Sequence, residues 1–499
     1  FATYNTTIAK KHNVGVLVGY NQEYCKSWWF NARKAGLISL STPVLTAASD
    51  LQSSDGGKDD YAMRSYFGRI NYDYAGKYLF EANVRMDGSS RFAPGNRWGT
   101  FPSFSAAWRI SEEAFWEDLK PIVDNLKIRA SWGRLGNNGI GNYDWQNVYS
   151  PANTSFGDAI QQGVWTTAIA NRDISWEKTD VVDLGLDVNL FGSLSLTFDY
   201  YNKLTHGILY RNPIPYVNGG LGAPMINSAK VRNRGFEFSA SYNKNFGDLG
   251  FAVSVNGAYN RNEIIDYKGD YLEINGATVW TEGQPIGKFY MREIDHIVQD
   301  KAEIDKLVSE GWTFSPSRPE PGDFLYKDLN NDKRIDDKDR VLKGQPLPLF
   351  TFGGSIAFSY KNFDLSALFS GVAGWDRYLS TGIFSLTNAD TERLFLKKFQ
   401  NQWSETNRNT NIPKLYASNE KNNQVSDYYL YDASFLRLKT LQLGYTLPKN
   451  LIPKVRIRAY CNLENYFTIT SYPGMDPEMN GDVGYPILKT VSLGVNIKF

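Results

Sequence analysis

The chain has few of the side chains that usually build a catalytic or metal centre. It has two cysteines, Cys25 and Cys461, far apart in the sequence, and three histidines in 499 residues. No two histidines are close in the sequence, and neither a Gly-x-Ser-x-Gly motif nor a zinc-ligand spacing occurs. These absences argue against an enzyme and against a disulfide-stabilised domain.

A charge imbalance and a membrane-spanning helix are absent as well. The 54 Lys and Arg residues nearly balance the 53 Asp and Glu residues, and the formal net charge is +1. This composition has no excess of positive charge that would indicate a nucleic-acid partner. No stretch approaches the roughly 20 uninterrupted apolar residues that a membrane-spanning helix needs. The chain is therefore either soluble, or it crosses a membrane with strands.

Apolar and polar residues alternate with period two, which indicates strands. Aromatic residues and glycine are abundant, with 31 Tyr, 29 Phe, 13 Trp and 43 Gly. Asp183 and Asp187 recur on the polar face of one segment, where a dry core could not hold carboxylates cheaply. The alternating apolar positions include Val182, Leu184, Leu186, Val188 and Leu190, then Phe236, Phe238, Ala240 and Tyr242, then Phe251, Val253, Val255 and Tyr259. The pattern predicts strands with one face toward lipid and the other toward a wet lumen.

The connections between these segments alternate in length. Short ones are expected at 10–13, 75–77, 191–193, 246–248, 361–363 and 448–453, and long ones at 37–63 and 376–430. A soluble β-sandwich, the main alternative, would have similar connections at both ends and an apolar interior. Short turns on one side and long loops on the other are typical of an outer-membrane barrel. We therefore predict an all-β, transmembrane antiparallel β-barrel with about fifteen strands in this chain.

Counting the strands adds three expectations. The short turns fall on one side only if residues 263–350 form a single long extracellular excursion. If the chain ends on the side of the short turns, an odd number of strands precedes Phe1, because bacterial single-chain barrels have even totals. Residues 111–119 are expected to form a short helix at the inner rim, with Ser111 as its N-cap.

Seven segments resemble the SusC/RagA family of TonB-dependent outer-membrane transporters, and the likeness extends over essentially the whole chain, 1–499. They are YFGRINY at 66–72, RMDGSSRF at 85–92, WGTFPS at 98–103, LKIRASWG at 126–133, GDFLYKD at 322–328, FLRLK at 435–439 and YPGMDPE at 472–478. The resemblance implies a barrel of about 22 strands, closed by an amino-terminal plug that follows a TonB box. The plug domain, the TonB box and the first strands are absent from this sequence.

The same resemblance implies a function in the bacterial outer membrane. It is active import of an oligosaccharide or an oligopeptide, energised through TonB, with a SusD-like surface lipoprotein as the lid and with membrane lipid around the barrel. One alternative is a siderophore or cobalamin receptor without a lid. Another is a passive structural or adhesive barrel.

One acidic loop resembles a calcium-binding loop. Oxygen-bearing side chains stand at positions 1, 3, 5, 9 and 12 of a twelve-residue segment that begins at Asp328, as in loops that wrap around Ca²⁺. The expected ligands are Asp328, Asn330, Asp332, the carbonyl of Arg334, Asp336 and Asp339. Lys333 replaces the usual glycine, and Asp339 replaces the usual glutamate. A solvated loop of mixed charge is the alternative.

Four tryptophans in the expected loops, Trp145, Trp165, Trp280 and Trp375, could stack on sugar rings or contact the lipoprotein. Packing within the loops is the simpler role. The final Phe499 resembles the carboxy-terminal signal of outer-membrane barrels, although an ordinary last strand could also end in this way.

Overall fold

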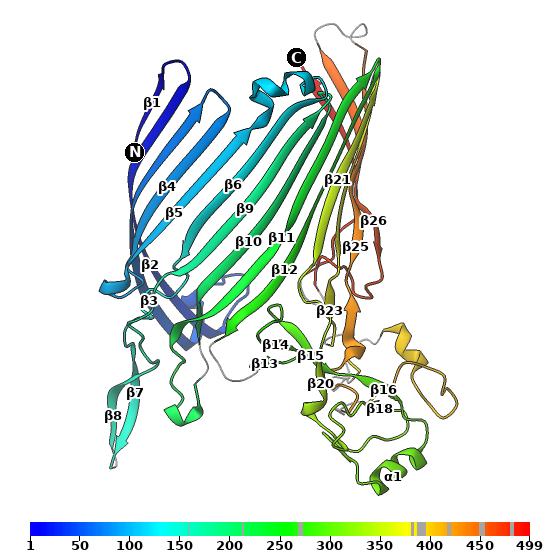
Figure 1. Cartoon of the computed structure of the whole chain (residues 1–499). Coiled ribbons are helices and arrows are strands. Elements are labelled where there is room, and N and C mark those ends of the chain that lie inside the picture. Colours follow the sequence, from blue (N-terminus) through cyan, green and yellow to red (C-terminus); the bar gives the residue numbers. More distant parts are fainter. Residues whose placement is uncertain are drawn as a thin grey trace. The chain divides into compact units, whose positions relative to one another are not determined.

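The computed structural model describes residues 1–157, 159–211, 214–267, 273–380, 384–386, 396–416, 421–448, 455–479 and 484–499. Within these residues fifteen strands form one sheet, and their order follows the chain (Figure 1). They are β1 (Ala2–Ile8), β2 (His12–Leu37), β3 (Ala48–Tyr74), β4 (Tyr78–Ser89), β5 (Trp98–Arg109), β6 (Val123–Asn137), β9 (Glu177–Leu190), β10 (Leu194–Arg211), β11 (Met225–Phe246), β12 (Leu249–Tyr267), β21 (Phe350–Tyr360), β22 (Phe363–Ala373), β25 (Phe435–Thr446), β26 (Arg456–Thr470) and β27 (Thr490–Lys498). Neighbouring strands pair antiparallel. The predicted all-β class and strand number are confirmed.

Short turns join many of these strands. Ala75, Phe191 and Lys361 have φ values of 54°, 55° and 52°, the left-handed conformation that a two-residue hairpin turn requires. Most of the turn predicted at 448–453 lies outside the described residues. The short helix predicted at 111–119 is present as two 3₁₀ helices, Ile110–Glu112 and Ala114–Leu119. The predicted N-cap is wrong, because Ser111 lies inside the first helix, whose N-cap is Arg109. None of the described helices is long and apolar enough to span a membrane.

Two compact units divide the chain. The first comprises Phe1–Ala114, Lys127–Leu184 and Asn202–Val231, and the second comprises Phe115–Leu126, Gly185–Tyr201 and Arg232–Phe499.

In the first unit, strand register places apolar and polar residues on opposite faces. One row of cross-strand partners is Tyr4, Val16, Ile70, Ala82, Phe104 and Trp132. The next row is Asn5, Gly15, Asn71, Glu81, Ser105 and Ser131, on the other face. Tyr4 and Ile70 remain 66% and 51% exposed. A face of exposed large apolar side chains fits lipid, as the alternation predicted.

Two rows of aromatic rings mark the limits of this apolar face. Tyr66 contacts the rings of Tyr20 and Trp98, and Tyr78 contacts those of Tyr74 and Trp108. Tyr66 and Tyr74 lie eight residues apart on β3, hence about 27 Å along the strand. A strand tilt of roughly 40° lowers this to about 20 Å, near the thickness of an apolar band in a membrane barrel.

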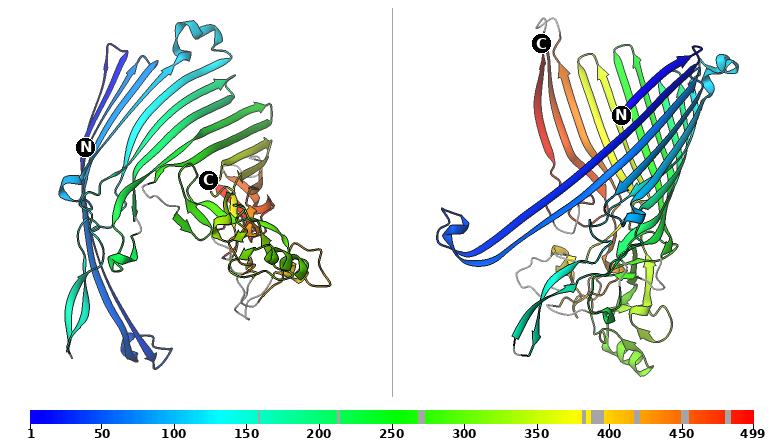
Figure 2. Two further views of the ribbon diagram at one scale, coloured as in Figure 1. Left: turned by 60° about the horizontal axis from the view of Figure 1, so that its bottom comes forward. Right: turned by 90° about the vertical axis from the view of Figure 1, so that its left-hand side faces the viewer.

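A long ribbon also belongs to the first unit. β2 and β3 pair from His12 to Leu37, whereas β4 accompanies β3 only as far as Met63. The remainder projects as a two-stranded hairpin (Figure 2). Most of the loop predicted at 37–63 is therefore strand. The connection from β6 to β9 carries a second hairpin, β7 (Tyr149–Phe156) with β8 (Ala159–Thr166).

In the second unit the two longest connections share one hydrophobic core. The chain between β12 and β21 forms the helix α1 (Lys301–Ser309), β13 (Glu273–Asn275), β14 (Thr278–Trp280), β15 (Lys288–Arg292), β16 (Ile294–Ile297), β17 (Thr313–Phe314), β18 (Phe324–Tyr326), β19 (Arg334–Ile335) and β20 (Arg340–Lys343). The chain between β22 and β25 adds β23 (Asp376–Tyr378) and β24 (Leu430–Asp432). Val298, Ile304 and Phe324 of the first pack against Phe399 and Tyr429 of the second. We call these two connections together the loop module.

Candidate functional site

The polar face of the first unit is hollowed beside β1 to β6. A hollow of about 830 Å³ is lined by Asn71, Glu81, Ser105, Arg129 and Asp183, among others. Arg129 and Asp183 approach to 4.0 Å, and their side chains are 29% and 28% exposed. Neutral hydrogen-bonding groups alternate here with charges of both signs. Such a wall can bind water or a polar solute, but its groups are not arranged as a nucleophile with a base.

Near the ends of the strands that carry the long connections, the inner face of the first unit becomes apolar. Phe92, Phe101, Ile140, Ile174 and Trp176 form a cluster in which each residue is at most 9% exposed. The segments 85–92 and 98–103, which carry the family resemblance, meet in this cluster. Period-two alternation could not predict it, because Phe101 occupies a position that alternation assigns to the polar face.

Glycine makes room for this cluster. A Cβ atom at Gly99 or Gly136 would overlap the ring of Phe101. The tip of the ring therefore occupies the space that side chains would fill at these positions of β5 and β6. The indole Nε1 of Trp176 donates to the carbonyl of Arg97 at 2.8 Å. The glycine of the WGTFPS segment has a packing role.

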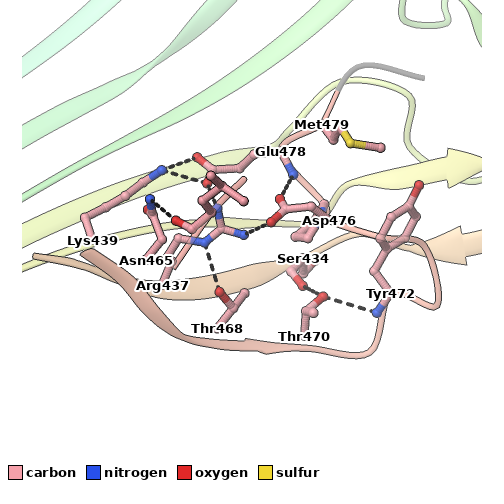
Figure 3. A network of polar contacts seen from close by, with 12 residues as sticks. Ser434, Arg437, Lys439, Asn465, Thr468, Thr470, Tyr472, Asp476, Glu478 and Met479 are labelled. Atoms are coloured by element: carbon pink, nitrogen blue, oxygen red, sulfur yellow. Dashed lines mark hydrogen bonds and ion pairs between the residues drawn. The ribbon is translucent and has the colours of Figure 1, made fainter. Parts of the chain in front are cut away.

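A polar network joins two other segments that carry the resemblance (Figure 3). Residues 472–479, which we call the strap, return after β26 and lie against β25. The guanidinium of Arg437 donates to Asp476 at 2.6 Å, to Thr468 at 2.9 Å, and lies 2.5 Å from Glu478. The ammonium of Lys439 donates to both oxygens of Glu478, at 2.9 and 2.7 Å.

The network is largely removed from water. The side chain of Arg437 is 1% exposed and that of Asp476 is 12% exposed, whereas Lys439 and Glu478 keep 29% and 26%. A buried guanidinium requires nearby carboxylates, because leaving it unpaired would cost several kcal/mol, on the order of 3–5. The strap supplies two of them.

A β-bulge explains why these two cations face inward. By strict alternation, Arg437 and Lys439 would share a face with Leu441 and Leu443, whose row of apolar partners includes the exposed Leu493. The register between β22 and β25 shifts by one residue beside Lys439. One extra residue reverses the faces beyond it, so that the cations point away from the apolar side.

The strap also contacts the loop module. The guanidinium of Arg377, on β23, donates to the carbonyls of Pro477 at 3.3 Å and Met479 at 2.6 Å, and lies over the ring of Tyr472. Tyr472 is 7% exposed and packs with Leu379. The strap therefore ties β25 to the module through both polar and apolar contacts.

Within the module, ionic contacts join the two long connections. The ammonium of Lys343 donates to Glu293 at 2.7 Å and to Asp427 at 2.8 Å. The hydrogen bond from Lys343 holds the pKa of Glu293 below its ordinary value. Asp323, of the 322–328 segment, is fully buried and accepts a hydrogen bond from the amide of Asn422 at 3.1 Å. The module is thus a folded body.

The acidic loop proposed for calcium lies at the edge of the module. Its oxygens accept hydrogen bonds from amides of the loop itself, in the pairs Asp328–Lys333, Asn330–Asp332, Asp332–Arg334, Asp339–Leu329 and Asp339–Asp336. Lys333 adopts φ 61°, the left-handed conformation for which a calcium loop uses glycine. Asp336 pairs with Arg334 at 2.8 Å.

No group of three or more His, Cys, Asp or Glu residues in the described ranges is placed to hold a metal ion. The calcium site therefore stays a prediction. Of the four loop tryptophans, Trp145 packs beside the Phe101 cluster and Trp375 beside Leu379. Trp165 is 48% exposed on β8, and Trp280 contacts the ring of Tyr267.

Fold and faces together define an outer-membrane β-barrel protein: exposed apolar rows on one side, a polar wall on the other, and short turns opposite long connections. Comparison with known proteins gives the family. The family described as "TonB dependent receptor-like, beta-barrel" matches residues 2–465, and the chain belongs to it.

Among its relatives, TonB-dependent receptor P3 of Formosa agariphila is 32% identical over 100% of this chain and 52% of its own length. TonB-dependent receptor SusC of Bacteroides thetaiotaomicron is 31% identical over 88% of this chain and 44% of its own. The solved structure of the RagAB peptide transporter has a TM-score of 0.84 at 28% identity, over 99% of this chain and 54% of that one. The chain spans about half the length of the relatives it matches, and the likeness to the SusC/RagA family is confirmed.

Proposed function

We propose that this chain is the barrel-forming part of an outer-membrane importer that takes up an oligosaccharide or an oligopeptide by a TonB-dependent mechanism. The observation that carries the proposal is the polar wall, with its hollow of about 830 Å³ beside Glu81, Arg129 and Asp183, behind a face of exposed apolar residues. The likeness to SusC and to the RagAB peptide transporter supports the class of cargo. The wall binds and guides solute, and catalysis has no part in the proposal.

The orientation follows from the turns. We place the short turns in the periplasm and the loop module, which contains most of the predicted excursions 263–350 and 376–430, outside the cell, because barrels of this membrane carry their long loops there. A SusD-like lipoprotein would rest on the module and close the lumen. The TonB contact and the plug would come from residues outside this chain.

We also propose that Ca²⁺ binds the loop 328–339 outside the cell. The support is the spacing of Asp328, Asn330, Asp332 and Asp339, and the left-handed Lys333 at the turn position. Asp336 and the carbonyl of Arg334 would complete the set. The ion would stiffen one edge of the module.

The experiment uses the full-length protein, purified from outer membranes in mild detergent. Mass spectrometry identifies chains and small molecules that co-purify. We expect a surface lipoprotein and a bound oligosaccharide or peptide, and uptake of that compound by cells should stop when TonB is deleted. A bound siderophore or cobalamin without a lipoprotein would replace this proposal with the lidless receptor. Uptake that is independent of TonB would favour a passive barrel.

A further inference from the structure

Three arginines lie at the loop-module end of the β11–β12 hairpin, on the same face as its exposed apolar residues. On β11 the outward positions Phe238 and Phe236 are succeeded by Arg234 and Arg232, and on β12 Tyr259 is succeeded by Arg261. Phe236 and Tyr259 are 46% and 39% exposed, as expected for side chains that face lipid. The lipid-facing surface therefore ends, on the side of the loop module, in a basic edge.

The inward residues between them support this assignment of faces. Asn233 accepts hydrogen bonds from Asn260 at 3.3 Å and from Asn262 at 2.9 Å, and Tyr201 donates to Asn260 at 2.9 Å. Asn233, Asn260 and Asn262 alternate with the arginines along β11 and β12. The arginines consequently point to the opposite, apolar side.

The positive charge of this edge is only partly neutralised. Glu263 is the one carboxylate that pairs with any of the three arginines in the described residues, at 3.8 Å from Arg234. The side chain of Arg234 is 42% exposed, and Arg261 is exposed. The Nε of Arg232 is a buried donor without an acceptor. Two positive charges remain, with several free N–H donors, beside an apolar surface.

We propose that Arg234 and Arg261, assisted by Arg232, bind the phosphate of a lipid headgroup in the outer leaflet of the membrane. Guanidinium groups form paired, charge-assisted hydrogen bonds with phosphate oxygens, a geometry that lysine cannot reproduce. Headgroup phosphates lie directly above the apolar band, where Phe236 and Tyr259 end. Continuity with the lipid-facing rows selects a membrane lipid over a soluble anion. The assignment to the outer leaflet rests on the orientation in the proposed function.

The test measures lipid binding to the full-length protein by native mass spectrometry. Delipidated protein in micelles is titrated with diphosphorylated lipid A and with the same lipid after removal of its phosphates. We expect the phosphorylated lipid to bind at least about tenfold more tightly. R234Q/R261Q should abolish that difference, and R234K/R261K should retain only part of it.

The matched control is R318Q/R408Q, which removes the same charge from two exposed arginines of the module, paired with Asp305 and Asp300. It should bind both lipids as the wild type does, and retained barrel folding is checked by heat-modifiable migration on gels. Equal binding of the two lipids, or an equal loss in the control, would overturn the inference. So would competition by inorganic phosphate at equal concentration, since the site would then be one for a free anion.

Uptake by cells is measured separately and distinguishes the two proposals. Failure of uptake in the wild type would contradict the proposed function, while the micelle titration would still report on the arginines. Normal uptake together with loss of lipid selectivity in R234Q/R261Q would support the inference.

Discussion

The strap offers the sharpest quantitative test, because its contacts differ in burial. Replacing Asp476 with Ala removes the most buried carboxylate partner of Arg437, whose side chain is 1% exposed. Glu478 would remain, at 26% exposure, as the sole counter-charge. Breaking a buried ion pair costs on the order of 3 kcal/mol or more. The free energy of strap opening should therefore fall by about 3 kcal/mol, and opening should become about a hundred times more frequent.

Two further variants separate charge from hydrogen bonding and from solvent exposure. Asp476→Asn keeps an oxygen for the backbone amide of Glu478, which now donates to Oδ1 of Asp476 at 2.8 Å. Because only the charge is lost, the free energy of strap opening should fall by about 1–2 kcal/mol. Lys439→Gln breaks a pair that is partly exposed, which is worth at most about 1 kcal/mol. The expected order of destabilisation is Asp476→Ala, then Asp476→Asn, then Lys439→Gln.

Hydrogen–deuterium exchange of the full-length protein measures how often the strap opens, and it therefore tests this order of destabilisation. The amides of Tyr472 and Met479 are suitable reporters, because they donate to Thr470 Oγ1 and to the carbonyl of Asp476, neither of which the variants remove. Asp300→Asn, at a module pair with 64% and 49% exposure, is the control and should change nothing near the strap. Unchanged exchange of both amides in Asp476→Ala, or an equal effect of Lys439→Gln, would refute the reasoning.

Three other results are expected. Lys333→Gly should tighten Ca²⁺ binding several-fold, because it removes a positive charge from the loop that would hold the cation; calorimetry without heat in either protein would reject the calcium site. Burial lowers the pKa of His296, but hydrogen bonds with Asp295 and Glu303 outweigh it and leave the pKa raised. Since protonation then favours the folded state, the protection of α1 amides relative to their intrinsic exchange rate at each pH should be greatest below about pH 6.5 and should fall as the pH passes through the raised pKa, and His296→Gln should remove this fall. Gly136→Ala should lower the melting temperature, because its Cβ overlaps the ring of Phe101; an unchanged value would contradict the packing role.

The sequence was sufficient for the sheet because the information that specifies it is local. An apolar residue at every second position, as in Val182, Leu184 and Leu186, assigns a face without reference to any other strand. Turn residues such as Phe191 and Lys361 then limit each strand. Class, strand number and the lipid side follow from these short-range patterns alone.

Contacts between distant segments could not be obtained in this way. The bulge beside Lys439 reverses a face. The apolar positions change phase there, from Leu436 and Leu438 to Leu441 and Leu443, but alternation alone does not decide between a bulge and the end of a strand. The shared core of the loop module needs Phe324 to meet Tyr429 across more than a hundred residues, and the sequence suggested two separate loops. Phe101 likewise lies on a face that alternation predicts to be polar. It is buried there because residues of the connections between strands, Ile140 and Ile174 among them, pack against it.

These failures and the family resemblance have a common physical origin. The 98–103 segment contributes Phe101 to its cluster, the 435–439 and 472–478 segments meet at Arg437, and the 322–328 segment buries Asp323. The first two contacts lie where long connections attach to the wall, and Asp323 lies inside the loop module. Any apolar side chain of adequate size can contact lipid. The lipid-facing rows therefore require apolar residues, but no particular ones. A buried guanidinium, or a ring packed against glycine, requires particular partners. Five of the seven segments that resemble the family contribute to such contacts, where pairwise geometry decides which residue fits and where local patterns are least informative. The other two, 66–72 and 126–133, lie within the wall strands β3 and β6.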